Sequence, residues 1–364
     1  MNPLRGTSVY CGMDVDIETI IKHLDDAQKA GINAIFTSLQ LPEADVEITL
    51  RDFPIMTKEA HKRGMVVAAD IAQRTATRFG IDLKDFKTLK KFGVDIMRLD
   101  AGYTDEEIVE VTHNTDGICV MMNADGTEEM LRNFTELGVN KEQTLFCHNY
   151  YPMKYTGKTR AQAKAINDLL HKYGFRVSGF LASQTHQRMA CSRGLPTVEA
   201  HRYLDAFPAA QEMQLLGFDD IFFGDDLASL EEMQTMVEAL SGPVTFRMKA
   251  LLDDPVIDWL DGHELEQIGN NLDEIVRSSF CDKNSLYPGN PNVGLPGAPK
   301  KGDVLLCKDT LYRYTGEIQI ARMDIPEDPD IGIIGHIIDS DISLLENFKT
   351  DDNWGPNFRF KVIK

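Results

Sequence analysis

Short apolar runs alternate with amphipathic segments along the first two thirds of the chain. The amphipathic segments repeat their apolar residues with a helical period, as Ile17, Ile20, Ile21 and Leu24 do at the start of segment 17–30. The apolar runs predict eight strands, at residues 7–12, 34–39, 65–72, 96–101, 118–123, 144–149, 177–182 and 221–224. Strands that alternate with helices form a parallel sheet, and eight such units predict an α/β fold of the (β/α)8 or TIM-barrel type.

Several helix ends are marked by capping residues. Gly31 follows the first helical segment and is expected to end it. The segments 104–107 (TDEE) and 229–232 (SLEE) are capping boxes that open two later helices, and Thr127 is placed to cap a third. An open doubly wound sheet is the alternative fold, but no Gly-x-Gly-x-x-Gly follows the first strand.

The pattern changes near residues 240–243 (LSGP). Segment 244–252 reads as a strand or a linker, and residues 287–299 form a long loop rich in Pro and Gly. Short β-rich runs follow, at residues 303–307, 311–314, 318–323, 331–338 and 358–363. We therefore expect two domains, a barrel over residues 1–242 and a small all-β barrel or sandwich over residues 243–364.

Polar side chains stand where the predicted barrel strands end. In a parallel barrel these ends share one rim, where the chemistry of such folds takes place. The acidic members of the set are Asp14, Asp70, Asp100, Asp225 and Asp226. Carboxylates gathered there can divide proton transfer between one protonated and one ionised group. The alternative role is helix capping or a salt bridge, and Asp14 and Asp226 suit capping best because each precedes a helix.

The neutral polar residues of the rim are suited to binding hydroxyl groups. They are Asn123, His148, Asn149, Tyr151 and Gln184. His148 has two other interpretations, a hydrogen-bonded core histidine and a general base.

Arginines follow the seventh and third predicted strands. Arg188, Arg193 and Arg202 lie in segment 183–202, in the loop region that often binds phosphate in such barrels, while Arg74 and Arg78 could add an anion contact. For any single arginine, a solvated surface charge is the alternative interpretation.

Composition narrows the function classes. The chain has 364 residues, 43% of them hydrophobic, and a formal net charge of −19, which argues against a nucleic-acid partner. No run approaches the roughly 18 apolar residues of a membrane span, and no secretory leader is visible at the start. The six cysteines show no Cys-x-x-Cys spacing, which favours a reducing cytoplasm.

Several catalytic motifs are missing from the sequence. It has no His-x-His in the first predicted strand, no lysine within the predicted barrel strands, no P-loop and no Gly-x-Ser-x-Gly. A metal held by Asp70, Asp100, Asp225 and His148 is chemically feasible, but no spacing demands it, so we expect neither a metal nor another cofactor.

A series of motifs resembles the MupG-like family of 6-phospho-N-acetylmuramidases over nearly the whole chain. The motifs are TSVYCGMDVD, GINAIFTSLQLPE, VVAADIA, RLDAG, MMNA, CHNYYP, GFLASQ and DDIFFGDD. The resemblance implies a TIM barrel followed by a cyclophilin-like domain. It also implies an intracellular glycoside hydrolase of Gram-positive bacteria, which cleaves a disaccharide of N-acetylmuramic acid 6-phosphate and N-acetylglucosamine during cell-wall recycling.

With that substrate, strand position suggests roles for the rim residues. Asp100 and Asp225 are the expected catalytic pair, with Asp70 as the alternate acid, and Arg188 and Arg193 are expected to hold the phosphate. The residues expected to position the sugar are Asp14, Asn123, His148, Asn149, Tyr151 and Gln184. The alternatives are a metal-assisted lyase or isomerase of a phosphosugar and a non-catalytic sugar-phosphate binding protein. The β domain is expected to shape the pocket mouth or to mediate dimerisation.

Overall fold

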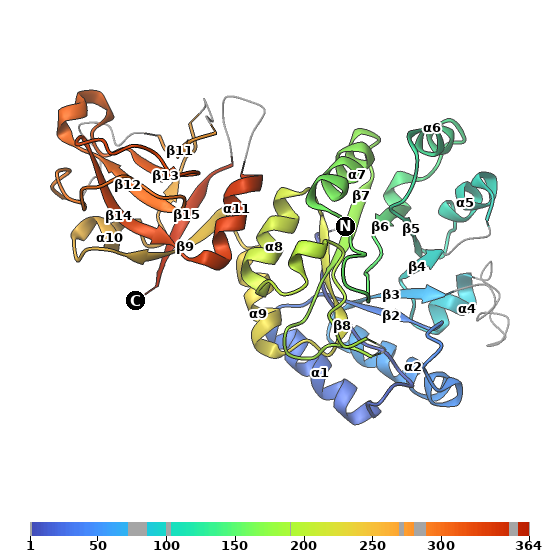
Figure 1. Cartoon of the computed structure of the whole chain (residues 1–364). Coiled ribbons are helices and arrows are strands. Elements are labelled where there is room, and N and C mark those ends of the chain that lie inside the picture. The colour runs from blue at the N-terminus through green and yellow to red at the C-terminus, as the bar shows by residue number, and fades with distance from the viewer. Residues whose placement is uncertain are drawn as a thin grey trace. The chain divides into compact units, whose positions relative to one another are not determined.

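The chain divides into two units, Met1–Glu238 and Ala239–Lys364, in the computed structural model (Figure 1). The structure describes residues 2–71, 86–99, 103–189, 191–268, 273–279, 289–348 and 356–363. Within these ranges, no helix is long and apolar enough to cross a membrane.

Eight parallel strands close into a barrel in the first unit, in the order β1 to β8. Each strand pairs with the next one along the chain, and β8 pairs with β1. The strands are β1 (Arg5–Ser8), β2 (Ala34–Ser38), β3 (Val66–Ile71), β4 (Ile96–Leu99), β5 (Cys119–Asn123), β6 (Thr144–Cys147), β7 (Arg176–Leu181) and β8 (Asp220–Asp226). The predicted TIM barrel is confirmed.

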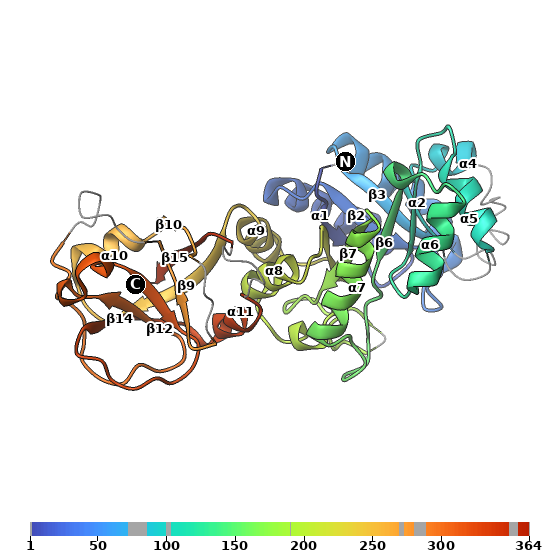
Figure 2. The same ribbon diagram turned by 90° about the horizontal axis from the view of Figure 1, so that it is seen from above.

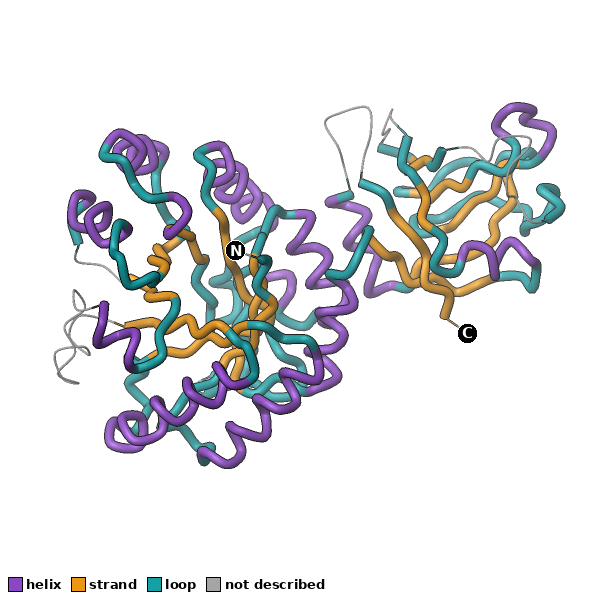
Figure 3. The backbone as a smooth tube through the Cα atoms, turned by 180° about the vertical axis from the view of Figure 1, so that it is seen from behind, coloured by secondary structure: helices purple, strands orange, loops and turns teal. Residues whose placement is uncertain are grey.

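Helices surround the ring of strands, as Figures 2 and 3 show from two other directions. They are α1 (Ile17–Ala30), α2 (Val46–Lys62), α4 (Phe86–Lys91), α5 (Asp105–Thr112), α6 (Glu128–Glu136), α7 (Arg160–Lys172), α8 (Ala206–Leu215) and α9 (Leu230–Ala239), with the short 3-10 helices η1 (Lys141–Gln143) and η2 (Glu199–His201).

The predicted helix ends are confirmed where the structure describes them. Gly31 ends α1 in the left-handed conformation, with φ of 85°. Thr104 and Glu107 form the expected reciprocal capping box, and Thr127 caps α6. The backbone amides of Ser229 and Glu232 likewise bond to each other's side chains at distances of 3.1 and 3.2 Å.

Aromatic rings fill the barrel interior. The Phe36 ring meets the Phe180 ring edge-on, with 5.0 Å between centroids, and both lie near Phe222. Gly6 on β1 leaves the room that Phe222 needs, because a Cβ at this position would lie 2.0 Å from that ring. The interior is therefore a packed core, and open space for a ligand has to come from the rim.

The second unit contains a curled, mixed sheet that forms a half-barrel, with strand order β10-β15-β9-β14-β12-β13-β11. Only β15 and β9 pair in parallel, and the other neighbours are antiparallel. The strands are β9 (Val244–Ala250), β10 (Glu264–Leu265), β11 (Ile275–Arg277), β12 (Asp303–Cys307), β13 (Ile318–Ala321), β14 (Ile331–Ile337) and β15 (Phe358–Ile363). Segment 244–252 is thus mainly a strand rather than a linker.

The second unit is not made of strands alone. It also contains α10 (Pro255–Leu260), α11 (Ile342–Asn347) and the 3-10 helices η3 (Asp309–Tyr314) and η4 (Asp339–Asp341). The strand predicted at residues 311–314 was wrong, because these residues belong to η3. Tyr312 has φ of 53° there, a backbone conformation that no regular strand contains.

Candidate active site

Polar side chains of neighbouring strands stand at one level of the barrel rim. Ser38 of β2 pairs with Asp70 of β3, and Asp70 pairs with Arg98 of β4. Asp70 is buried, and its Oδ2 accepts hydrogen bonds from Gln40 Nε2 at 2.6 Å and from Ser38 Oγ at 3.4 Å. The β2 and β3 ends therefore hold this carboxylate in one orientation.

Arg98 links three neighbouring strands at the rim. Its Nη2 donates to Asn123 Oδ1, at 2.6 Å, and to Asn149 Oδ1. The structure thus brings together two of the residues that we expected to bind sugar, through an arginine that we had not predicted as a site residue. A two-residue period would have found it, since Arg98 follows Ile96 on the barrel-facing side of β4.

Arg188 reaches the rim from the loop after β7. Its guanidinium carbon lies 4.6 Å from the centre of the Tyr10 ring and 5.6 Å from that of Tyr150. The side chain is buried, yet Nε and Nη1 have no hydrogen-bond partner among the residues that the structure describes. Two aromatic faces stabilise the cation, and the unfilled donors leave it able to bind an anion.

Asp226, at the end of β8, is a buried carboxylic acid with an unfilled oxygen. The residue is 3% exposed, and its Oδ1 has no hydrogen-bond partner within the described ranges. Burial raises the pKa of Asp226 to about 7, although the neighbouring His186 and Arg188 act in the opposite direction. Such a group is protonated in part at neutral pH, as a general acid must be.

Asp225, the neighbour of Asp226, has a different environment. Its carboxylate accepts hydrogen bonds from the backbone amides of Ser183, Arg188 and Leu195, at distances of 2.9 to 3.0 Å. Burial raises the pKa of Asp225 while these three bonds oppose the rise. Because both oxygens are occupied by the loop after β7, Asp225 positions that loop and thereby Arg188.

His148 lies in the protein core. It is 1% exposed, its Nε2 lies 2.8 Å from Asn167 Oδ1, and its ring contacts the Phe218 ring at 5.1 Å between centroids. Burial lowers the pKa of His148 to about 4, so the ring is neutral. These contacts match the core interpretation that we had left open.

Other expected site residues lie at the surface. Gln184 is exposed and donates to the backbone oxygen of Arg202 at 3.0 Å. Tyr151 is half-buried beside Lys158, which forms an ion pair with Asp125 at 3.0 Å.

Asp14 and Arg193 are exposed, and Asp16, not Asp14, caps α1. Arg202 is buried and binds backbone oxygens and Glu199, which makes it a structural arginine. Asp100, Arg74 and Arg78 lie outside the described residues.

Two residues near Arg188 were missed at first. Tyr10 donates its hydroxyl to the Gly224 oxygen at 2.9 Å and supports the guanidinium. Glu43, in the loop after β2, is exposed, and its negative charge is one of those that raise the pKa of Arg188. The local sequence around Tyr10 and Glu43 does not predict that either residue lies near Arg188, because Arg188 belongs to a loop that is distant in the sequence.

A metal site is not apparent in the described ranges. They contain no group of three or more His, Cys, Asp or Glu side chains that could hold a metal ion. Two of the four ligands considered for such a site, Asp225 and His148, are hydrogen-bonded to protein groups.

Comparison with known proteins agrees with this architecture. Family models of the 6-phospho-N-acetylmuramidases match residues 5–238 with their N-terminal part and residues 273–361 with their C-terminal part. A search among curated proteins finds no match.

Two solved structures share the fold over nearly their whole length. An uncharacterized B. cereus protein has a TM-score of 0.85 at 22% identity, with 100% of both chains covered. A conserved Enterococcus faecalis protein of unknown function has a TM-score of 0.71 at 24% identity, with 98% of this chain and 96% of that one covered. Since the N-terminal family model alone spans most of the sequence, this chain belongs to the 6-phospho-N-acetylmuramidase family.

Proposed function

We propose that the protein is a cytoplasmic glycosidase that hydrolyses a disaccharide of N-acetylmuramic acid 6-phosphate and N-acetylglucosamine during cell-wall recycling. The observation that carries this proposal is the pair of incompletely bonded groups at the barrel rim, the acid Asp226 and the cation Arg188. Buried groups with unfilled hydrogen bonds are rare, and a bound phosphosugar would supply the missing partners. The family to which the chain belongs points to the same reaction.

Asp226 is the proposed general acid. It donates its proton to the glycosidic oxygen as the bond between that oxygen and the anomeric carbon breaks. Asp70 is the proposed second carboxylate, either as the nucleophile or as the base that takes a proton from water. A separation of about 5–5.5 Å between the two carboxyl groups in the complex would produce retention, and about 6.5–9.5 Å would produce inversion.

Asp226 takes the role that strand position had suggested for Asp225. The three backbone amides on Asp225 leave its oxygens no room for a proton-transfer role without release of the loop. We therefore assign Asp225 to positioning and keep Asp100 as a candidate from sequence only.

Arg188 is the proposed phosphate ligand. Its Nε and Nη1 have no partner among the described residues, and a guanidinium group forms strong, charge-assisted hydrogen bonds with phosphate oxygens. Asn123 and Asn149 turn their oxygens towards Arg98, and their amide nitrogens make no hydrogen bond within the described part of the chain. Those nitrogens are placed to donate to sugar hydroxyls or to an acetamido oxygen.

The decisive experiment compares the phosphorylated disaccharide with its unphosphorylated twin, using mass spectrometry to follow cleavage by the purified full-length protein. We expect the protein to cleave the phosphorylated form and to leave the other largely intact. Asp226→Asn should abolish cleavage, whereas Asp14→Asn, a change at an exposed carboxylate, should not.

Each other outcome contradicts a different part of the proposal. Cleavage of neither disaccharide would exclude the muramidase reaction, and equal cleavage of both would exclude the phosphate role of Arg188. Turnover that a chelator abolishes would favour a metal-assisted reaction. Tight binding without turnover, unchanged in Asp226→Asn, would favour a binding protein.

A further inference from the structure

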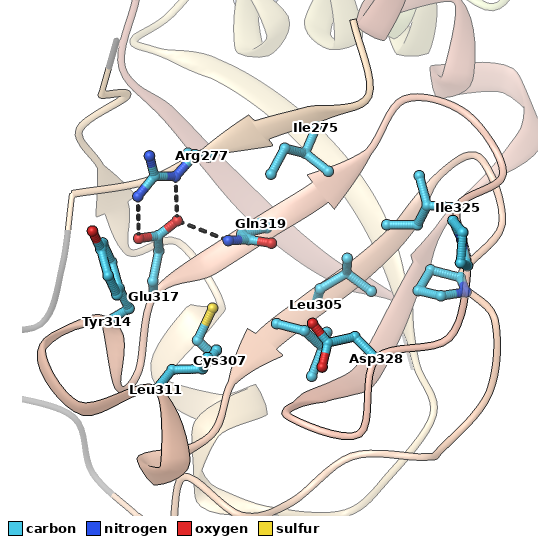
Figure 4. A pocket seen from close by; sticks show the side chains of 13 residues that line it. Ile275, Arg277, Leu305, Cys307, Leu311, Tyr314, Glu317, Gln319, Ile325 and Asp328 are labelled. Atoms are coloured by element: carbon cyan, nitrogen blue, oxygen red, sulfur yellow. Dashed lines mark hydrogen bonds and ion pairs between the residues drawn. The ribbon is translucent and has the colours of Figure 1, made fainter. Parts of the chain in front are cut away.

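A pocket lies within the half-barrel unit, lined by residues of β11, β12 and β13 and of the loops beside them (Figure 4). Its volume is about 490 Å³, which falls inside the range of small-molecule sites, roughly 300–1,000 Å³. A register row crosses four strands here, because Arg277 pairs with Gln319, Gln319 with Leu305, and Leu305 with Ile333. Paired residues point to the same face of a sheet, so this row sets the chemistry of the floor.

Most of the pocket wall is aliphatic. Leu305 is buried and belongs to a cluster with Ala321 and Ile333, and the partly exposed Ile325 and Ile331 pack against that cluster. Ile275 completes the wall on β11. The wall therefore offers a surface for a branched hydrocarbon group, which gains free energy by leaving water.

The polar end of the pocket is fixed by a buried carboxylate. The Glu317 carboxylate accepts hydrogen bonds from Arg277 Nε at 2.7 Å and from Arg277 Nη2 at 2.8 Å. Its Oε1 also accepts a hydrogen bond from Gln319 Nε2 at 2.9 Å. A carboxylate only accepts hydrogen bonds, so the Gln319 oxygen must point away from it, as Figure 4 shows. This oxygen and Arg277 Nη1 have no hydrogen-bond partner among the described residues.

The charges at this end cancel. Glu317 is fully buried and matches the Arg277 cation with a two-point ion pair, while the Tyr314 ring lies 5.7 Å from the guanidinium carbon. This end of the pocket therefore presents one hydrogen-bond donor and one acceptor without net charge. The carboxylate of Asp328 also lines the pocket, which disfavours an anionic ligand. Burial raises the pKa of the Cys307 thiol to about 12, so this lining residue is a neutral contact rather than a nucleophile.

We propose that this pocket binds a small uncharged amide that carries a branched aliphatic group. The amide N–H donates to Gln319 Oε1, and the amide oxygen accepts from Arg277 Nη1. The aliphatic group packs on Leu305, Ile275 and Ile325. The site lies wholly within the second unit and does not depend on the glycosidase reaction.

The test uses N-methylisovaleramide as the probe and the isoleucine δ1-methyl NMR signals of the full-length protein as the readout. We expect saturable shifts of Ile275, Ile325 and Ile331, with a dissociation constant in the millimolar range that suits so small a ligand. Methyl isovalerate, which lacks the N–H, should bind about fivefold more weakly. The isovalerate anion should bind more weakly still, since no unmatched positive charge faces it.

Two variants separate the polar and apolar parts of the site. Gln319→Leu should weaken binding of the amide about fivefold and leave binding of the ester unchanged. Ile325→Trp, which fills the pocket from a loop, should abolish binding of both. The matched controls Gln214→Leu and Ile55→Trp, at exposed positions of the first unit, should change neither.

Three results would overturn the proposal. One is the absence of shifts in the three methyl signals, and another is an ester or an acid that binds as tightly as the amide. The third is undiminished binding of the amide to a folded Ile325→Trp protein.

Discussion

Asp225 and Asp226 are adjacent on β8, but their carboxylates are engaged in opposite ways. Asp225 accepts hydrogen bonds from three backbone amides of the loop after β7, whereas one oxygen of Asp226 has no partner in the described part of the chain. One residue positions the loop that carries Arg188, and the other is the proposed acid beside it. Substitutions at the two positions should therefore fail for different reasons.

Replacement of the two aspartates by asparagine provides the first prediction. Asp226→Asn should lower kcat by about 10²–10⁴-fold, the usual contribution of a general acid, with little loss of thermal stability. Asp225→Asn should lower the melting temperature, because each hydrogen bond to a charged group contributes about 1.5–3 kcal/mol. In the variant, the asparagine NH2 group would also face at least one backbone N–H, so that two donors meet. Turnover and thermal unfolding of both variants check this. Equal melting temperatures for Asp225→Asn and wild type would contradict the positioning role.

The raised pKa of Asp226 predicts a dependence of stability on pH. The folded protein holds this proton up to about pH 7, whereas the unfolded chain releases it near pH 3.8, the ordinary pKa of an aspartic acid. The contribution of Asp226 to the free energy of unfolding is therefore complete at low pH and falls as pH rises from about 4 to 7, by an amount on the order of 4 kcal/mol. The free energy of unfolding, measured by urea unfolding, should depend less on pH over this range in Asp226→Asn than in wild type. In wild type, kcat/KM should decline above about pH 7.

Arg188 should determine the preference for a phosphorylated substrate. Arg188→Met removes the proposed phosphate donors and should lower kcat/KM for the phosphorylated disaccharide by roughly 10–100-fold, as expected from lost charged hydrogen bonds. The low rate with the unphosphorylated twin should hardly change. Arg193→Met, at an exposed position, is the control and should behave as wild type. A large loss of kcat/KM in Arg193→Met would instead support a role for Arg193 in binding the phosphate.

His148 should contribute to stability rather than to catalysis. Its pKa is lowered to about 4 by burial, while the unfolded histidine titrates near 6.5. Protonation therefore favours the unfolded chain, and the stability that the neutral ring provides is lost as pH falls from about 6.5 towards 4. In His148→Gln, this acid-side loss of stability in urea unfolding should shrink, and kcat at neutral pH should stay within about threefold of wild type. A variant that folds normally but is inactive would restore the proposed role in binding.

Much of the fold could be predicted from periodicity alone. Helix α1 has the predicted bounds because its apolar spacing, its following Gly31 and its packing on the barrel all agree. Residues 311–314 were misassigned because four residues are too few to separate a strand from a 3-10 helix. The alternative of a linker at 244–252 could not be resolved either, since β9 becomes a strand only by pairing with β14 and β15, whose paired residues are 85 or more positions away.

The candidate site was predictable at the level of the rim, not of individual roles. Alternation along a strand separates Asn149, which meets Arg98, from His148, which faces Asn167. No local pattern separates Asp225 from Asp226, because the difference is made by backbone amides 30 to 42 residues earlier in the chain. Burial by distant loops, not residue type, decides which carboxyl group keeps its proton.

Among the described residues, the loop that carries Arg188 is bonded to Asp225 through its main-chain N–H groups alone. The side chains of this loop can therefore be replaced without loss of the hydrogen bonds to Asp225, provided that the backbone still presents the same N–H groups. Randomising Gln187, Arg188 and Met189 while retaining Asp225 is thus a rational route to barrels of altered anion preference. The groups that fix the loop in place are thus different from the side chains that determine which anion it binds.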